Sequence, residues 1–338
     1  MSLPADVKRP LLIKCEEETD PRYGKPPHER SVEELLRFGV INLDKPRGPT
    51  SHQVAAWVKQ ILKLNKVGHG GTLDPKVSGI LPITLENATK VVRALLKAGK
   101  EYVCVMRLHG DVRREELEKV LKQFVGEIYQ KPPLRSSVKK TVRIKHIYYI
   151  DLLEVKGRFV LFKVGCEAGT YIRKLCHDIG EVLGVGAHMY ELRRTRVGPF
   201  KEDSTLARLQ DILDAYIFWK EDGNEKLIRR YIQPMEKAVE HLPKIYIKDN
   251  AVDAICNGAM LAAPGVVKLE DGIKPGDLVA IMTLKGELVA LAEAKMSSRE
   301  ILEAEKGIVA ITTRVIMPRG TYPPAWRKRK EGKEYKFK

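Results

Sequence analysis

A glycine-rich loop at residues 68–75 contains the residue best placed to do chemistry. The segment reads Gly-His-Gly-Gly-Thr-Leu-Asp-Pro, and Asp74 is its only acidic residue. Glycines let the backbone approach a ligand closely, and the proline after Asp74 holds that residue in an extended conformation. The loop can therefore present one carboxylate to a substrate. The alternative is a plain glycine-rich turn in which Asp74 is only a turn former.

Other motifs that contain such glycines do not fit this segment. It is not G-x-x-x-x-G-K-[ST], it lacks the last glycine of G-x-G-x-x-G, and no G-x-S-x-G accompanies it. A lone carboxylate also argues against an ordinary glycosidase, which uses two. The five cysteines are widely separated, and the eight histidines form no cluster with metal-ligand spacing. We therefore expect reduced thiols and chemistry that needs neither a metal nor a cofactor.

Three further segments carry side chains that could act together with this loop. Lys45 comes at the end of an expected strand, before a proline, where an exposed turn is the alternative. Tyr102 opens an alternating strand, where an aromatic residue is more often part of the core. Arg173 lies in the first turn of an expected helix, where the helix dipole disfavours a cation. We therefore expect an anionic partner for Arg173.

The spacing of apolar residues predicts the elements that would position these side chains. A short strand over 39–43 runs into a Pro/Gly turn, and Thr50 or Ser51 caps the helix that follows. Its expected apolar face consists of Val54, Trp57, Val58, Ile61 and Leu62. A helix over 86–98, with Gly99 as its stop, follows. Its expected buried residues are Val91, Val92, Leu95 and Leu96.

Beyond residue 99, strands and helices alternate irregularly. The strand over 101–109 alternates, with Tyr102, Cys104, Met106 and Leu108 on one face. A short helix ends at Gly126, and a strand over 159–166 leads into a helix capped by Thr170. The apolar face of that helix comprises Ile172, Leu175, Cys176, Ile179, Val182 and Leu183. This order favours an α+β fold with a mixed sheet over repeated βαβ units.

The pattern of expected secondary structure changes near residue 243. Five short strands, separated by turns, are expected at 244–247, 265–269, 278–282, 287–294 and 307–317. Strands with this spacing predict a small β-rich second domain that extends to about residue 318.

The composition is that of a basic protein with ample core material. The chain has 338 residues, 60 Lys and Arg against 44 Asp and Glu, a formal net charge of +16 and 43% hydrophobic residues. These values exclude acidic, disordered and membrane-spanning proteins, and the length suggests about two domains. No apolar run approaches the ~18 residues of a membrane helix, and none near the N-terminus suits a signal peptide, so we expect a cytoplasmic protein.

The positive charge is clustered in three places. One cluster comprises Arg135, Lys139, Lys140, Arg143 and Lys145. A second comprises Arg193, Arg194 and Arg196, and the tail from Arg327 has seven basic residues against two acids. A single cluster of basic residues usually belongs to a solvent-exposed face of the protein. Three in one chain favour a nucleic-acid partner, whose binding would depend on salt through counterion release.

Five motifs in one order resemble a known family. They are INLDKPRGPTSH, GHGGTLDPKVSGILP, GKEYV, AGTYIRKLCHDIG and GAHMYELRRTRVGPF, and they resemble the TruB branch of RNA pseudouridine synthases over residues 38–205. The region 243–318 is similar to a PUA domain, an RNA-binding β-barrel. The resemblance implies an α+β catalytic domain with a mixed, largely antiparallel bent sheet and a small β-barrel PUA domain.

Within that family the chain is most similar to the catalytic subunit of H/ACA guide-RNA particles, in its archaeal form without long Lys-rich tails. Bacterial members carry an insertion that grips tRNA after a Gly-Asp step. Here Gly110-Asp111 runs almost directly into a helix, which argues against unaided tRNA binding.

The resemblance assigns roles to six residues. Asp74 becomes the catalytic carboxylate, which either attacks the nucleoside or abstracts a sugar proton. Tyr102 would stack on the extruded uracil and assist proton removal from C5, and Arg173 would pair with Asp74. Leu192 would form an apolar wall over the base. Lys45 would brace the loop or a phosphate, and His69 would lie against the flipped nucleotide, or be satisfied by backbone groups.

The resemblance also implies an organisation and a set of partners. The expected segments are an N-terminal arm at 1–37 that packs on the PUA domain, a catalytic domain at 38–242, the PUA domain at 243–318 and a basic tail at 319–338. The expected partners are guide RNA, target rRNA or tRNA, and three subunits: one zinc-ribbon-like, one β-barrel and one that binds kink-turns. No membrane is expected.

Two alternatives stay open, and the sequence argues against a third. The enzyme could act without a guide on uridine 55 in the TΨC loop of tRNA. A non-catalytic RNA-binding scaffold would share the basic surface but would not need Asp74, Tyr102 and Arg173 together. A base-exchange enzyme with a PUA domain would need a clustered zinc site, which the sequence does not contain.

Overall fold

The computed structural model describes residues 2–131 and 141–324. The basic residues Arg135, Lys139 and Lys140 and the tail from Arg327 lie outside the described residues. The chain divides into two compact units. Unit 1 comprises 1–7, 40–85 and 95–233, and unit 2 comprises 8–39, 86–94 and 234–338.

Unit 1 is built on one mixed, eleven-stranded sheet. Its main path runs β11-β2-β4-β9-β5-β8-β7-β6, with β3, β10 and β12 paired at its sides. Its strands are β2 (Gly39–Lys45), β3 (Val67–His69), β4 (Ser78–Leu85), β5 (Lys100–Leu108), β6 (Gly126–Gln130), β7 (Arg143–Lys156), β8 (Phe159–Cys166), β9 (Ala187–Val197), β10 (Phe200–Lys201), β11 (Leu206–Ala207) and β12 (Ile232–Pro234). The large sheet confirms the α+β prediction with a mixed sheet.

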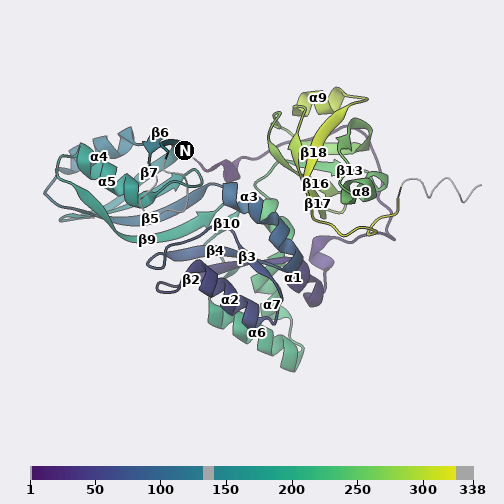
Figure 1. The fold of residues 1–338 in the computed structure, drawn as a ribbon, viewed down its shortest axis with the longest axis horizontal. Helices are drawn as coiled ribbons and strands as arrows, with labels where there is room; N and C mark the ends of the chain where they lie inside the picture. Colours follow the sequence, from purple (N-terminus) through teal and green to yellow (C-terminus); the bar gives the residue numbers. More distant parts are fainter. Residues whose placement is uncertain (1, 132–140, 325–338) are drawn as a thin grey trace, which may run out of the picture. The chain divides into compact units, whose positions relative to one another are not determined.

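Helices cover unit 1 in two places. They are α2 (Ser51–Ile61), α4 (Arg114–Gln123), α5 (Ile172–Val182), α6 (Leu209–Asp222) and α7 (Lys226–Tyr231), with a 3-10 turn at Pro4–Asp6. Figure 1 shows α4 and α5 on one face of the part of the sheet that contains β5 and β9. Beneath them lies a hydrophobic core that includes Cys104, Met106, Phe162, Leu175 and Ile179.

Gly79 joins the two halves of this sheet. Strands β4 and β9 run parallel and pair only at Ser78 with Arg193 and at Gly79 with Arg194. Gly79 has a φ of +106°, and a Cβ there would lie 2.2 Å from the carbonyl oxygen of Arg194. Only glycine permits this approach. The two halves of the sheet therefore meet directly beside the loop that carries Asp74.

Unit 2 contains a curled, seven-stranded sheet with the order β1-β15-β13-β16-β17-β18-β14. Its strands are β1 (Leu11–Ile13), β13 (Lys244–Ile247), β14 (Leu261–Ala262), β15 (Val266–Glu270), β16 (Leu278–Thr283), β17 (Leu288–Ala294) and β18 (Ile308–Val315). Its α-helices are α1 (Val32–Phe38), α8 (Asp249–Cys256) and α9 (Ser298–Glu303), with 3-10 helices at Pro27–Glu29, Glu86–Val91, Met235–Val239 and Ala263–Gly265. The short N-terminal strand β1 pairs antiparallel with β15.

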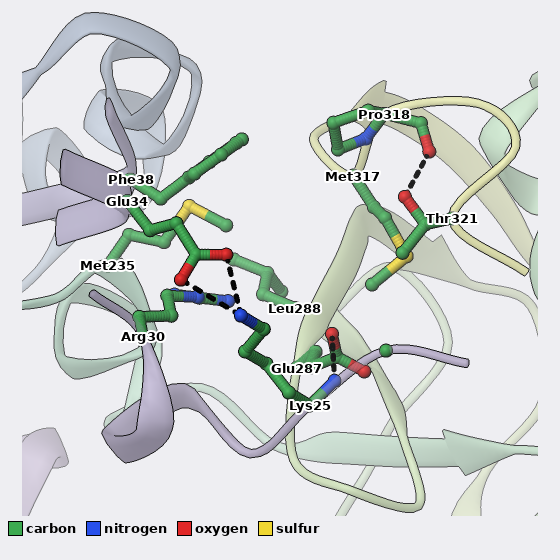
Figure 2. Close-up of a pocket in the computed structure, with 11 residues that line it drawn as sticks. Lys25, Arg30, Glu34, Phe38, Met235, Glu287, Leu288, Met317, Pro318 and Thr321 are labelled. Carbon is green, nitrogen blue, oxygen red and sulfur yellow. Dashed lines mark hydrogen bonds and ion pairs between the residues drawn. The ribbon is translucent and has the colours of Figure 1, made fainter. Parts of the chain in front are cut away.

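Unit 2 also contains a cavity of about 310 Å³ (Figure 2). Phe38, Met235, Leu288, Met317 and Pro318 supply its apolar lining. Lys25 and Glu34 form an ion pair of 3.0 Å at this cavity. Arg30, another lining residue, is buried and forms two hydrogen bonds, of 2.7 and 2.8 Å, with the carboxylate of Glu236.

Most predicted elements occur at the predicted positions, but some details were wrong. Helix α2 begins after Thr50, whose side chain accepts a hydrogen bond from the Gln53 N–H, as predicted. Several residues expected in apolar faces are exposed: Trp57 (41%), Leu96 (49%) and Val182 (56%). The segment expected as one helix over 86–98 is a 3-10 helix followed by α3 (Val92–Lys97).

The predicted cap of α5 was also wrong. The N-cap residue is Tyr171, and the hydroxyl of Thr170 donates to the carbonyl of Glu167 instead. Within the described residues, no helix is long and apolar enough to cross a membrane.

Candidate active site

The loop that carries Asp74 is anchored on both sides of that residue. The Ser51 hydroxyl accepts a hydrogen bond from the Leu73 N–H at 2.8 Å and lies 3.1 Å from the Leu73 carbonyl. After Asp74, the Pro75 carbonyl accepts from the Gly48 N–H at 2.8 Å. The Asp74 side chain itself stays 56% exposed. The backbone is therefore fixed while the carboxylate faces solvent.

Arg173 lies beside this carboxylate. Its Nη2 donates a hydrogen bond to Oδ2 of Asp74, which closes a link across 99 residues of sequence. Arg173 is in the first turn of α5, so the structure supplies the anionic partner that its position requires. Both side chains are more than half exposed, and such pairs contribute only about 0–1 kcal/mol to stability. The effect of this pair is therefore to orient Asp74.

Lys45 lies under the same loop and is fully buried. Its amine donates to the carbonyls of Pro46 at 2.8 Å, Val77 at 2.9 Å and Pro75 at 3.4 Å. Burial, together with the nearby Arg194, lowers the pKa of Lys45, whereas the charge of Asp74 raises it. Lys45 thus braces the loop on the C-terminal side of Asp74.

Arg194 is the most buried arginine of the site, at 1% exposed. On β9 its Nε donates to the Ile80 carbonyl at 2.8 Å, and its Nη2 donates to the Gly71 carbonyl at 2.9 Å. Its guanidinium also interacts electrostatically with the phenol of Tyr102 on β5. One guanidinium therefore ties together the glycine-rich loop, β4 and the tyrosine.

The sequence reasoning did not assign this role to Arg194, although a signal was present. Leu192 and Arg194 are two residues apart on a strand, so both point toward the same face. A cation on the inward face of an alternating strand requires buried partners.

Tyr102 is half-buried at the start of β5, directly opposite Arg194 in the pairing of β5 with β9. Burial raises the pKa of its phenol, against a lowering effect of Arg194. The hydroxyl is therefore protonated at neutral pH. Tyr102 can supply a flat aromatic surface, but it can act as a base only after it loses a strongly held proton.

Lys100 is a second buried cation that the sequence reasoning missed. It is 5% exposed, and its amine donates to the carbonyls of Leu95, Leu96 and Ala98 at 3.1, 2.9 and 2.7 Å. Burial, followed by the repulsion of Arg194, lowers its pKa to about 7. In the sequence, the position of Lys100 indicates this burial, because it directly follows the end of one helix and begins a core strand.

We predict that Lys100 makes stability depend on pH. Because the folded-state pKa of about 7 lies below the unfolded value, the folded protein carries the full cost of a buried charge below pH 7. That cost is relieved as the pH rises toward about 10, by up to about 4 kcal/mol. Urea unfolding at pH 6.5, 8 and 9.5 should show wild type gaining stability relative to Lys100→Met. If the free energies of unfolding of the two proteins changed with pH in parallel, the lowered pKa of Lys100 would be contradicted.

The three buried cations carry positive charge without acidic partners. Within the part of the chain that the structure describes, Lys45, Lys100 and Arg194 all bond to backbone carbonyls, and none forms an ion pair. Lys100, with a pKa of about 7, carries its charge only part of the time at neutral pH, whereas Arg194 carries a fixed charge. Positive charge in a buried setting favours an anionic carboxylate and negative charge that develops on a substrate. The arrangement fits a site that handles an anionic nucleotide.

His69 lies at the other end of the loop, in β3. Its ring meets that of His52 edge-on, with centroids 5.0 Å apart, and its Nδ1 is buried without a hydrogen-bond partner among residues 2–131 and 141–324. Burial, then His52 and Arg194, lower the pKa of His69, so the imidazole is neutral. Both histidines line a cavity of about 410 Å³ that also contains Lys59 and Lys66. The cavity combines aromatic rings with cations.

Leu192 is 7% exposed and belongs to the hydrophobic core beneath the site. It pairs with Cys104 across β9 and β5, two residues from the pair of Arg194 with Tyr102. The structure thus brings Asp74, Arg173, Lys45 and Tyr102 into one network of contacts. His69 and Leu192 are connected to it through the loop and the core. No group of three or more His, Cys, Asp or Glu residues in the described ranges could hold a metal ion.

Four family models match the chain. They are the TruB family pseudouridylate synthase N-terminal domain at 59–172, the tRNA pseudouridylate synthase B C-terminal domain at 173–240, the PUA domain at 243–316 and the DKCLD (NUC011) domain at 2–55. Tyr102 and the loop that carries Asp74 fall within the match to the TruB N-terminal domain. Arg173 is the first residue matched by the C-terminal domain.

Relatives and solved structures agree with these family matches. The chain is 64% identical over 324 residues to a probable tRNA pseudouridine synthase B of Methanopyrus kandleri, covering 96% of each chain. It is also 64% identical over 328 residues to one of Pyrococcus furiosus, covering 97% of this chain and 96% of the relative.

Two solved structures superpose on nearly the whole chain. A Cbf5-Nop10-Gar1 complex contains a chain that matches with a TM-score of 0.93 and 64% identity, over 95% of this chain and 98% of that one. An H/ACA RNP bound to a substrate RNA containing 2'-deoxyuridine contains one with a TM-score of 0.90 and 61% identity, over 96% and 100%. The chain therefore belongs to the TruB family of pseudouridine synthases and has the PUA domain that its sequence predicted.

Proposed function

We propose that this pseudouridine synthase is the catalytic subunit of an H/ACA guide-RNA particle and acts on rRNA in the cytoplasm. The observation that carries the proposal is the exposed Asp74 carboxylate, oriented by Arg173 above buried cations. The solved complexes of similar chains with Nop10, Gar1 and substrate RNA support the particle. We extend the set of partners to guide RNA and to a kink-turn-binding subunit.

The reaction we propose for Asp74 is an isomerisation. Asp74 attacks the nucleoside or removes a sugar proton while the bond between N1 and C1' of uridine breaks. The uracil then rotates and a bond forms between C5 and C1', while the bond from Asp74 to the nucleoside breaks or Asp74 returns the proton to the sugar. C5 then loses its proton and N1 gains one. Atoms and electrons balance without an external reactant.

The other residues position the base and the carboxylate. Arg173 holds Asp74 by a charge-assisted hydrogen bond, and Tyr102 supplies a surface on which the extruded uracil stacks. Leu192 forms the apolar wall of the base pocket on the side of the hydrophobic core. Lys45 keeps the loop in place, and His69 contacts the displaced nucleotide.

The test compares guided with unguided substrates. Tritium release from C5-tritiated uridine should occur in a guide-matched RNA when guide RNA and accessory subunits are present. A guide with two mismatches beside the target uridine serves as the control and should abolish release. Release from tRNA without guide would instead establish a stand-alone activity on uridine 55. Tight RNA binding without release from any substrate would leave only a scaffold.

A further inference from the structure

Gln130, the last residue of β6, has a buried amide whose two hydrogen bonds go to one residue. The side chain is 2% exposed. Its Oε1 accepts from the Tyr171 N–H at 2.9 Å, and its Nε2 donates to the Tyr171 carbonyl at 3.2 Å. The amide thus bonds to the backbone of Tyr171 as a neighbouring strand would.

This contact is made where α5 begins. Tyr171 is the N-cap residue of α5, and its side chain makes no capping hydrogen bond. Its carbonyl also accepts the first intrahelical hydrogen bond, from the Leu175 N–H at 3.0 Å. A helix start usually depends on a short polar N-cap side chain. Here the side chain that holds the start of the helix belongs to Gln130, 41 residues earlier in the sequence.

The start of α5 determines where Arg173 can reach. Arg173 is two residues beyond Tyr171, in the first turn, and its guanidinium bonds to Asp74. The ion pair is more than half exposed, so it cannot by itself hold the helix in register. A displacement of about 1 Å at a reacting group can lower turnover by about 100-fold. The position of the Tyr171 backbone is therefore a condition for the Asp74–Arg173 geometry.

We propose that Gln130 is a positioning residue for the isomerisation: it clamps Tyr171, and so places Arg173 against Asp74. The inference rests on the function proposed for Asp74 and adds a residue whose two side-chain hydrogen bonds go to Tyr171 and not to Asp74 or Arg173. It also links the end of β6, at the edge of the sheet, to the reacting carboxylate.

The test separates positioning from a general loss of structure. Gln130→Met removes both hydrogen bonds at similar volume, and we expect kcat to fall about 100-fold. RNA affinity should stay within about threefold, because no phosphate contact is altered. Gln130→Glu keeps the acceptor for the Tyr171 N–H but loses the donor, and it should give a smaller fall. If Gln130→Met does not fold, Gln130→Glu decides, and an unchanged kcat overturns the proposal.

Asn42 supplies the matched control. It is a buried amide of the same unit, 1% exposed, which donates to the Lys201 carbonyl at 2.8 Å. The partners of its amide nitrogen, Lys201 and Thr205, both lie outside α5. Asn42→Leu should lower the melting temperature and leave kcat within about threefold. An equal fall in kcat for both variants would overturn the proposal.

A double-mutant cycle tests whether Gln130 acts through Arg173. In an Arg173→Met background, Gln130→Met should produce little further fall in kcat, because the group it positions is gone. A full additional 100-fold fall would overturn the proposed route. Wild-type enzyme without turnover would contradict the function proposed for Asp74 instead, so the two failures are distinguishable.

Discussion

Asp74→Asn is expected to abolish turnover while the protein folds and binds RNA normally. The substitution is isosteric, but an amide neither attacks the nucleoside nor removes a proton. Removing the reacting group of an enzyme commonly lowers kcat by about 10⁴-fold or more. Because the pair with Arg173 is exposed, the free energy of unfolding should change by less than about 1 kcal/mol.

Asp111→Asn is the matched control for this prediction. Asp111 is also an exposed carboxylate in unit 1 that pairs with an arginine, Arg158, at 2.8 Å. Its loss removes the same charge from the same unit, so we expect wild-type tritium release. Comparable losses in the two variants would mean that net charge, and not the chemistry of Asp74, limits the reaction.

Arg194→Met is expected to cause the largest combined loss of stability and activity. The substitution leaves the carbonyls of Gly71 and Ile80 without their common donor and removes the charge that acts on the phenol of Tyr102. Unsatisfied buried groups cost about 1–3 kcal/mol each, partly offset because a buried charge is also removed, so we expect a loss of about 3 kcal/mol. The loosened loop should lower kcat by about 100-fold.

Arg193→Met provides the comparison on the same strand. Arg193 is 35% exposed and pairs with Asp44 and Glu202. Partly exposed pairs of this kind contribute about 1 kcal/mol or less. Arg194→Lys should fall between the two, because a single amine cannot reproduce the fork of the guanidinium. Urea unfolding and single-turnover kinetics measure both effects. Equal losses for Arg193→Met and Arg194→Met would contradict the structural role given to Arg194.

The elements with strong local signals could be predicted from the sequence. Thr50 caps α2, β5 alternates, and the glycine-rich loop presents Asp74, because each depends on neighbours within a few residues. The need of Arg173 for an anion was also readable, since a cation in the first turn of a helix is unfavourable without one. The structure supplies Asp74 as that anion.

Features that depend on long-range register could not be predicted in the same way. Arg194 gains its role only because β9 lies between β4 and β5. Thr170 was the natural local cap for α5, but Gln130 approaches from a distant strand and takes over that task. Trp57 and Leu96 follow apolar spacing and are nevertheless exposed. Periodicity identifies a face of a helix, but it does not establish how far the covering elements extend over that face.

The most direct test of the account is single-turnover formation of pseudouridine in an RNA with one target uridine. The RNA is bound with its matched guide and accessory subunits, digested after the reaction and analysed by mass spectrometry and chromatography, with Asp74→Asn as the blank. We predict one pseudouridine of unchanged mass at the target for wild type and none for Asp74→Asn. Tightly bound RNA that keeps its uridine in wild type, or pseudouridine formed equally by Asp74→Asn, would contradict the role of Asp74.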